Sequence, residues 1–162
     1  MTEISTYHQI GRFVFMFQHA EAALTELLVL MAGADDEFVR ILVNELEYNK
    51  RVKTTDVMFA RFIDLRRQPD QAAKAEFHDL MVELLSLGER RNDIVHSKYM
   101  RWINVNGATG LIRESSKLKA SKGSRDVEEE SLLPEAFEAD FERLSVSLQT
   151  LERFRLKIID LL

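Results

Sequence analysis

The chain has 162 residues, of which 46% are hydrophobic and 30% charged, and its formal net charge is −5. This length suits one folded domain, which we expect to cover residues 1–162. The absence of cysteine excludes disulfides, thiolate catalysis and cysteine-bound zinc, and we expect a cytoplasmic protein with neither a membrane-spanning run nor an N-terminal leader.

The first helix is predicted over about Thr6–Met31, where apolar residues recur at alternating steps of three and four. Glu21 falls on this apolar seam, between Phe17 and Leu24. A buried carboxylate is costly unless it is paired, so we expect Glu21 to have a cationic partner.

A second, short helix should follow Gly33, with Asp35 or Asp36 as its N-cap. Its predicted apolar face consists of Phe38, Ile41, Leu42 and Leu46. The helical pattern continues to Ile63, with a bend near residues 48–49, and ends before Pro69.

The third long helix is predicted over about Asp70–Lys98. A β-hairpin follows, in which "RWINV" and "LIRES" flank a turn with Asn106 and Gly107 in left-handed conformations. Residues 114–131 are predicted to be a polar, mobile loop, and Pro134 should open the last helix. The fold class is therefore all-α: an antiparallel bundle of four to five helices with a small β-hairpin inserted before the last helix.

Polar residues interrupt the apolar stripe of the third long helix in "GERRNDIVHSKYM". At about 100° per residue, Arg91 and Asn92 fall on either side of the stripe, and His96 lies one turn beyond Asn92. We expect this cluster to face the bundle or a partner, and Gly88 to allow a second copy of the helix to approach across a twofold axis.

The chemistry of this cluster suits phosphate groups. His96 is the side chain whose proton moves near neutral pH, and the fork of Arg91 matches phosphate oxygens. Cleavage of RNA would need two histidines, one to accept a proton and one to donate it, which two copies of the chain would supply. The segment Gly88–Arg125 carries nine basic and three acidic residues, and it is either a polyanion site or a solvated loop.

The run "RNDIVH", Arg91–His96, resembles the R-x4-H motif of HEPN domains, and the order of the predicted elements is similar to the HEPN helical bundle over most of the chain. The resemblance implies a homodimeric, metal-independent endoribonuclease without a cofactor, of the kind found in toxin–antitoxin and phage-defence systems. It also implies that Arg91 and His96 are the catalytic pair, that Asn92 and Glu21 support them, and that RNA or a nucleotide and an antitoxin protein are partners.

Further candidate contacts to RNA are Arg90, Lys98, Tyr99, Arg101, Lys117 and Lys119. The alternative function is a non-catalytic dimeric module that binds a nucleotide, RNA or a partner protein through the same surface. In structural terms, Arg91 and Glu21 would form a buried ion pair whether or not the site is catalytic, and the alternative for His96 is an interaction with the helix dipole. Metal binding is not expected, because di-iron bundles need two Glu-x-x-His pairs and the chain has none.

Overall fold

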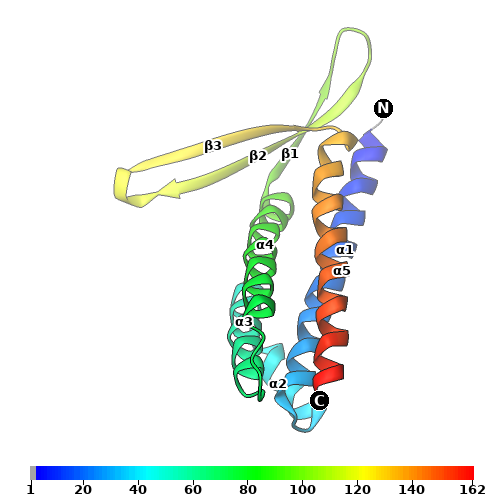
Figure 1. Cartoon of the computed structure of the whole chain (residues 1–162). Coiled ribbons are helices and arrows are strands. Elements are labelled where there is room, and N and C mark those ends of the chain that lie inside the picture. The colour runs from blue at the N-terminus through cyan, green and yellow to red at the C-terminus, as the bar shows by residue number, and fades with distance from the viewer. Residues whose placement is uncertain (1–2) are drawn as a thin grey trace. The chain divides into compact units, whose positions relative to one another are not determined.

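The computed structural model describes residues 3–162, with side chains from residue 5 onward. These residues form five α-helices, three β-strands and two short 3-10 helices (Figure 1). The helices are α1 (Glu3–Ala32), α2 (Asp36–Asn44), α3 (Tyr48–Asp64), α4 (Gln71–His96) and α5 (Glu138–Leu161). The strands are β1 (Lys98–Ile103), β2 (Thr109–Lys119) and β3 (Ser124–Leu132), and the 3-10 helices are η1 (Ala120–Lys122) and η2 (Pro134–Phe137).

The described chain divides into two compact units. Unit 1 contains the chain up to Phe15 together with Glu89–Glu142, and unit 2 contains Met16–Gly88 together with Arg143–Leu162. Helices α1, α4 and α5 each contribute residues to both units.

Unit 2 has a helical core that includes three phenylalanine rings, one each from α3, α4 and α5. Phe59 stacks on Phe77 with 4.0 Å between ring centroids, and Phe154 meets both rings edge-on, at 5.2 and 4.9 Å. These edge-to-face and stacked arrangements add to the free energy gained by burying the rings.

The apolar seam of α1 differs by one position from the prediction. Ala20 is 0% exposed, whereas Glu21 is only half-buried. The seven-residue step from Phe17 to Leu24 can pass through either residue at helical spacing, and the core accepts the smaller, uncharged one. The segment Ser5–Ala32 is, by length and composition alone, long and apolar enough to cross a membrane, contrary to our expectation of no such run. Core helices of soluble proteins share these properties.

The short helix α2 has the predicted N-cap but buries the opposite face. The side chain of Asp35 accepts a hydrogen bond from the backbone N–H of Phe38 at 3.1 Å. Val39 and Val43 are buried, and the residues predicted to face the core, Phe38, Ile41 and Leu42, are exposed. The sequence of α2 is apolar on both faces, so its pattern does not determine which face is covered.

Unit 1 contains a three-stranded antiparallel sheet in the order β1–β2–β3, where we had predicted a two-stranded hairpin. The expected mobile loop over 114–131 instead forms most of β2 and β3, a long two-stranded ribbon in Figure 1. The many charged residues of this segment led to the prediction of a loop, but they lie on paired strands in which Lys117 is opposite Asp126. In the β1–β2 turn only Gly107 has a positive φ, of 78°, so the left-handed conformation predicted for Asn106 is wrong.

Candidate functional site

The C-terminal turns of α4 place the predicted motif on the edge of unit 1 rather than in its core. Ile94 is buried, Arg91 is half-buried, and Asn92 and His96 are exposed in the described chain. Asn92 and His96 therefore do not face the core, and the alternative, that they face a partner, stays a prediction. The cationic residue on the buried side is instead Arg90, whose side chain is only 17% exposed.

Arg90 belongs to an ionic network that sequence analysis did not find. Its guanidinium donates to both carboxylate oxygens of Glu130, at 2.8 and 3.0 Å, and to Asp140 at 2.9 Å. Arg113, which is 5% exposed, donates through Nε to Glu130 at 2.9 Å. Two arginines and two carboxylates thus satisfy one another, as buried charges must. Arg90 is committed to this network and is not a free contact for RNA.

The network shifts the pKa values of Glu130 and Arg90. Burial by itself would raise the pKa of Glu130, but the hydrogen bonds and charges of Arg90 and Arg113 lower it below its ordinary value. Burial acts to lower the pKa of Arg90, and Glu130 and Asp140 outweigh it, so that this pKa is raised. Glu130 is therefore an ionised anchor near neutral pH and not a proton donor. One signal could have pointed to the network: Arg113 alternates with Leu111 and Ser115, which places it on the buried face of β2.

A pocket of about 200 Å³ lies where the end of α4 meets β2, within unit 1. Three predicted site residues line it: Asn92 and His96 from α4, and Lys117 from β2. The other lining residues are Asp93, Ser97, Ser115 and Ser116. The pocket therefore combines an imidazole, an ammonium, an amide and three hydroxyls with one carboxylate.

Contacts around the pocket orient its polar groups. Arg91 donates from a terminal guanidinium nitrogen to Oδ1 of Asn92 at 3.1 Å, which leaves the amide nitrogen of Asn92 as a donor. Nζ of Lys117 lies 3.6 Å from Oδ1 of Asp93, a partly exposed ion pair. The hydroxyl of Ser97 donates to the Asp93 carbonyl and accepts from Arg113 at 3.1 Å. Arg91 is thus coupled to the rim of the pocket through Asn92.

The remaining predicted contacts have different surroundings. Tyr99 is half-buried, and its hydroxyl donates to the carbonyl of Ile94 at 2.5 Å, so the ring packs on the structure instead of being offered to a base. Burial raises the pKa of this phenol. Lys119 forms an ion pair with Asp126. Lys98 and Arg101 are exposed on β1.

Glu21 lies in unit 2, whereas Arg91 lies in unit 1. The predicted pairing of Glu21 with Arg91 therefore stays a prediction.

Gly88 lies on the buried stripe of α4, as predicted, and the group that approaches it belongs to the same chain. A Cβ at this position would lie 2.5 Å from Cε1 of Tyr48. The Tyr48 hydroxyl donates to the carbonyl of Leu84 at 2.7 Å and holds the ring there. Gly88 is therefore explained by packing within unit 2 and gives no support to a helix from a second copy.

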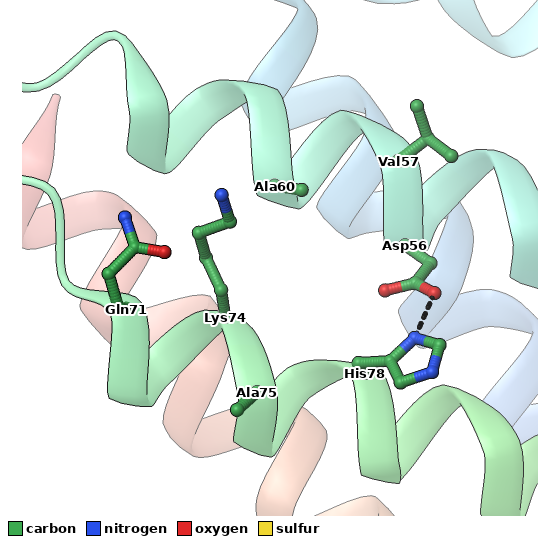
Figure 2. Close-up of a pocket in the computed structure, with 7 residues that line it drawn as sticks. All are labelled: Asp56, Val57, Ala60, Gln71, Lys74, Ala75 and His78. Carbon is green, nitrogen blue, oxygen red and sulfur yellow. Dashed lines mark hydrogen bonds and ion pairs between the residues drawn. The ribbon is translucent and has the colours of Figure 1, made fainter.

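A separate hollow of about 420 Å³ lies between α3 and α4 in unit 2 (Figure 2). Asp56 and His78 face each other at one end, with 2.7 Å between Oδ2 and Nδ1, and Lys74 and Gln71 lie at the other end. The hydrogen bond with Asp56 raises the pKa of His78. Lys74 is itself paired with Asp64 at 2.7 Å. Each cation of this hollow thus already has an anionic partner.

Over the described part of the chain, no group of three or more histidine, aspartate or glutamate side chains is arranged to hold a metal ion. Comparisons with protein-family models, with curated proteins and with solved structures find no match to this chain.

Proposed function

We propose that this chain is a HEPN-like, metal-independent endoribonuclease in which Arg91 and His96 act on the phosphodiester of RNA. One observation supports the proposal above the others: His96 and Asn92 on α4 share a pocket with Lys117, a residue from a strand 21 positions further along the chain than His96. Arg91 contacts the same rim through Asn92. An exposed imidazole beside two cationic side chains is the set that cleavage of RNA by its own 2′-hydroxyl requires.

In the proposed reaction, His96 accepts the proton of the 2′-hydroxyl while the 2′-oxygen attacks the adjacent phosphorus. The bond from phosphorus to the 5′-oxygen breaks, which leaves a 2′,3′-cyclic phosphate on one fragment and, after protonation, a 5′-hydroxyl on the other. Arg91 and Lys117 would stabilise the added negative charge on the phosphate oxygens in the transition state. Water enters only if the cyclic phosphate is later hydrolysed.

The second proton transfer points to a homodimer. One imidazole lines the pocket in the described chain, and the 5′-oxygen needs an acid as it leaves. A second copy of the chain would supply its own His96 in a composite site. Sedimentation at micromolar concentration should therefore show a dimer, and a strictly monomeric protein that cleaves RNA would exclude the composite site.

The activity is tested with purified protein and RNA in EDTA, and with analysis of the ends of the products. We expect fragments with 2′,3′-cyclic phosphate ends, and a loss of at least about a hundredfold in rate for His96→Ala and for Arg91→Ala. His8→Ala is the matched control, because His8 is an exposed histidine of α1 that does not line the pocket. Equal cleavage by wild type, His96→Ala and His8→Ala would contradict the catalytic role of His96.

A role as a toxin or phage-defence effector in the cytoplasm belongs to the same proposal. Expression of the wild-type chain in a bacterium should then arrest growth, and expression of His96→Ala should not. An antitoxin protein would be recovered as a partner that relieves the arrest. Growth that is equally normal with both forms would contradict the effector role.

A non-catalytic binding module is the second candidate function. The observation that favours it is the carboxylate of Asp93, which lines the pocket and pairs with Lys117, in a chain whose net charge is −5. A carboxylate beside the reacting phosphate opposes the build-up of negative charge. This function would be favoured if RNA or a nucleotide binds without being cleaved and if His96→Ala leaves the binding affinity unchanged.

A further inference from the structure

The hydroxyl of Ser115 is buried and without a partner. Ser115 is 8% exposed, and its Oγ makes no hydrogen bond within the described chain. A buried hydroxyl in this state costs free energy, since it has given up its hydrogen bonds to water. Folded proteins retain few such groups, and one that lines a pocket calls for a ligand that supplies the missing hydrogen bond.

Ser115 lines the same pocket as His96 and Lys117. Residues 113, 115 and 117 alternate along β2 and point to one side of the strand. Arg113 is fixed there by Glu130 and by the Ser97 hydroxyl, at 2.9 and 3.1 Å. The Ser115 hydroxyl and the Lys117 ammonium are therefore carried by an anchored strand and face the end of α4.

We propose that Ser115 and Lys117 form a phosphate-binding wall on β2, which holds the phosphate group of the RNA against Asn92 and His96 of α4. This role rests on the proposed function, because it assigns the groups that hold the substrate in the same pocket. Neither residue transfers a proton. Both bind and position the phosphate.

The hydrogen-bond donors that line the pocket favour an anion over a cation as its ligand. Lys117 donates only, and Asn92 offers its amide nitrogen because Arg91 occupies Oδ1. A divalent cation would have to displace the ammonium of Lys117 from Asp93, its partner at 3.6 Å. A phosphate group in this pocket of about 200 Å³ would instead be bound by the donors that line it, the Lys117 ammonium, the Asn92 amide and the Ser115 hydroxyl.

On β3, the carboxylates of Asp126 and Glu128 lie opposite Lys117 and Ser115 and oppose an anion at this place. Two features of α4 also oppose it, and one of these gives a test. The C-terminal end of α4 carries the negative end of the helix dipole, but Arg113 and Ser97 both donate to the Asp93 carbonyl there, Arg113 at 3.5 Å. The Asp93 carboxylate competes directly for Lys117. Asp93→Asn should remove that competition and tighten phosphate binding by about threefold.

The first experiment titrates the full-length protein with inorganic phosphate at pH 7 and follows backbone amide shifts by NMR, with chloride at equal ionic strength as the reference. We expect saturable shifts at residues 92–97 and 115–117. Ser115→Ala should weaken binding by about tenfold, since a hydrogen bond to a charged group is lost. Lys117→Ala should weaken it at least as much, and Lys122→Ala, which removes the same charge from η1, should not change it.

Stability separates a binding role from a structural one. Removing an unpartnered buried hydroxyl should leave the melting temperature of Ser115→Ala unchanged or raise it, while phosphate affinity falls. Shifts that do not saturate, or that fall equally in Lys117→Ala and Lys122→Ala, would overturn the proposed wall. So would wild-type affinity in both Ser115→Ala and Lys117→Ala.

The second experiment measures cleavage of RNA by the same variants. If phosphate binds as proposed but RNA is not cut, the wall stands and the ribonuclease proposal fails. If RNA is cut at the wild-type rate by Ser115→Ala and Lys117→Ala, the wall is not where the substrate binds, and the role proposed for Lys117 in the transition state fails with it, while the roles of Arg91 and His96 stand. A 2′-deoxy dinucleotide, which cannot be cleaved, should show the same affinity losses in the two variants as inorganic phosphate.

Discussion

Replacing Gly88 by alanine tests the packing of α4 against Tyr48. In the interior of a helix this change normally stabilises a protein by up to about 1 kcal/mol, because glycine loses more backbone freedom on folding. At Gly88 the new methyl carbon would lie 2.5 Å from Cε1 and 2.8 Å from Cδ1 of Tyr48. Ordinary carbon–carbon contacts are about 3.5–4.0 Å, so the ring would have to move by about 1 Å.

The surroundings of Tyr48 determine what this movement costs. The ring packs on Phe17, with 4.8 Å between centroids, and its hydroxyl donates to the Leu84 carbonyl at 2.7 Å. Overpacking a filled site costs about 1–3 kcal/mol, and a lost hydrogen bond adds about 1 kcal/mol. After the gain in helix propensity, Gly88→Ala should lower the free energy of unfolding by about 1–3 kcal/mol.

Gly11 provides a matched control within the same chain. It lies inside α1, and a Cβ there would meet no atom within 4 Å. Gly11→Ala should therefore stabilise the protein by about 0.5–1 kcal/mol. Urea denaturation at 25 °C, followed by circular dichroism, gives both values.

A third variant identifies the cause of the loss at Gly88. In a Tyr48→Ala background the methyl group has room, so adding Gly88→Ala should cost nothing further. The reasoning would be refuted if Gly88→Ala raised the urea midpoint as Gly11→Ala does. It would also be refuted if the loss persisted in full without the Tyr48 ring.

Two predictions concern pH. Arg90 and Arg113 lower the pKa of Glu130, so its contribution to stability is present above the unfolded-state pKa and is lost as pH falls through the folded value. Glu130→Gln should therefore lower the free energy of unfolding by about 2 kcal/mol at pH 7 and flatten the fall in the urea midpoint between pH 5 and 3. Parallel curves of urea midpoint against pH for the two proteins would contradict this. Asp56 raises the pKa of His78, so the stability that this pair adds is full below the unfolded-state pKa and is lost as pH rises through the folded value. In an NMR titration, Asp56→Asn should move the His78 transition to lower pH, and an unchanged transition would show that Asp56 is not the cause.

The long helices were predictable because each repeats a strong apolar period, and the N-cap of α2 at Asp35 was confirmed because a cap depends on local sequence. Which residue of a pair is buried was not predictable. Ala20 and Glu21 both fit the seven-residue step of α1, and only the packed core distinguishes them. The ribbon of β2 and β3 was missed because its stability comes from pairs such as Lys117 with Asp126, which are distant in the sequence, and because charged residues resemble a solvated loop when taken singly.

The residues of the candidate site likewise include some that the sequence predicts and one that it does not. Arg91 and His96 could be found from a short local motif. Ser115 could not, because its relevance depends on the register of β2 against β3 and on its place beside the end of α4, although the strand "LIRES" that contains it was predicted.

The register of β2 also sets the charge of the pocket. Arg113 is anchored by Glu130 and Ser97, and alternation then directs residues 115 and 117 toward α4. A slip of one residue would present Glu114 in place of Ser115 and would remove Lys117 from the pocket, which would replace a neutral hydroxyl and an ammonium with a carboxylate. The buried arginine–glutamate network is costly to desolvate, and an apolar cluster of the same size would stabilise the sheet as well. Arg113 and Glu130 are register partners of opposite charge on β2 and β3, so their ion pair favours the observed register over a shifted one. In that register Ser115 and Lys117 line the pocket, as the proposed phosphate-binding wall needs.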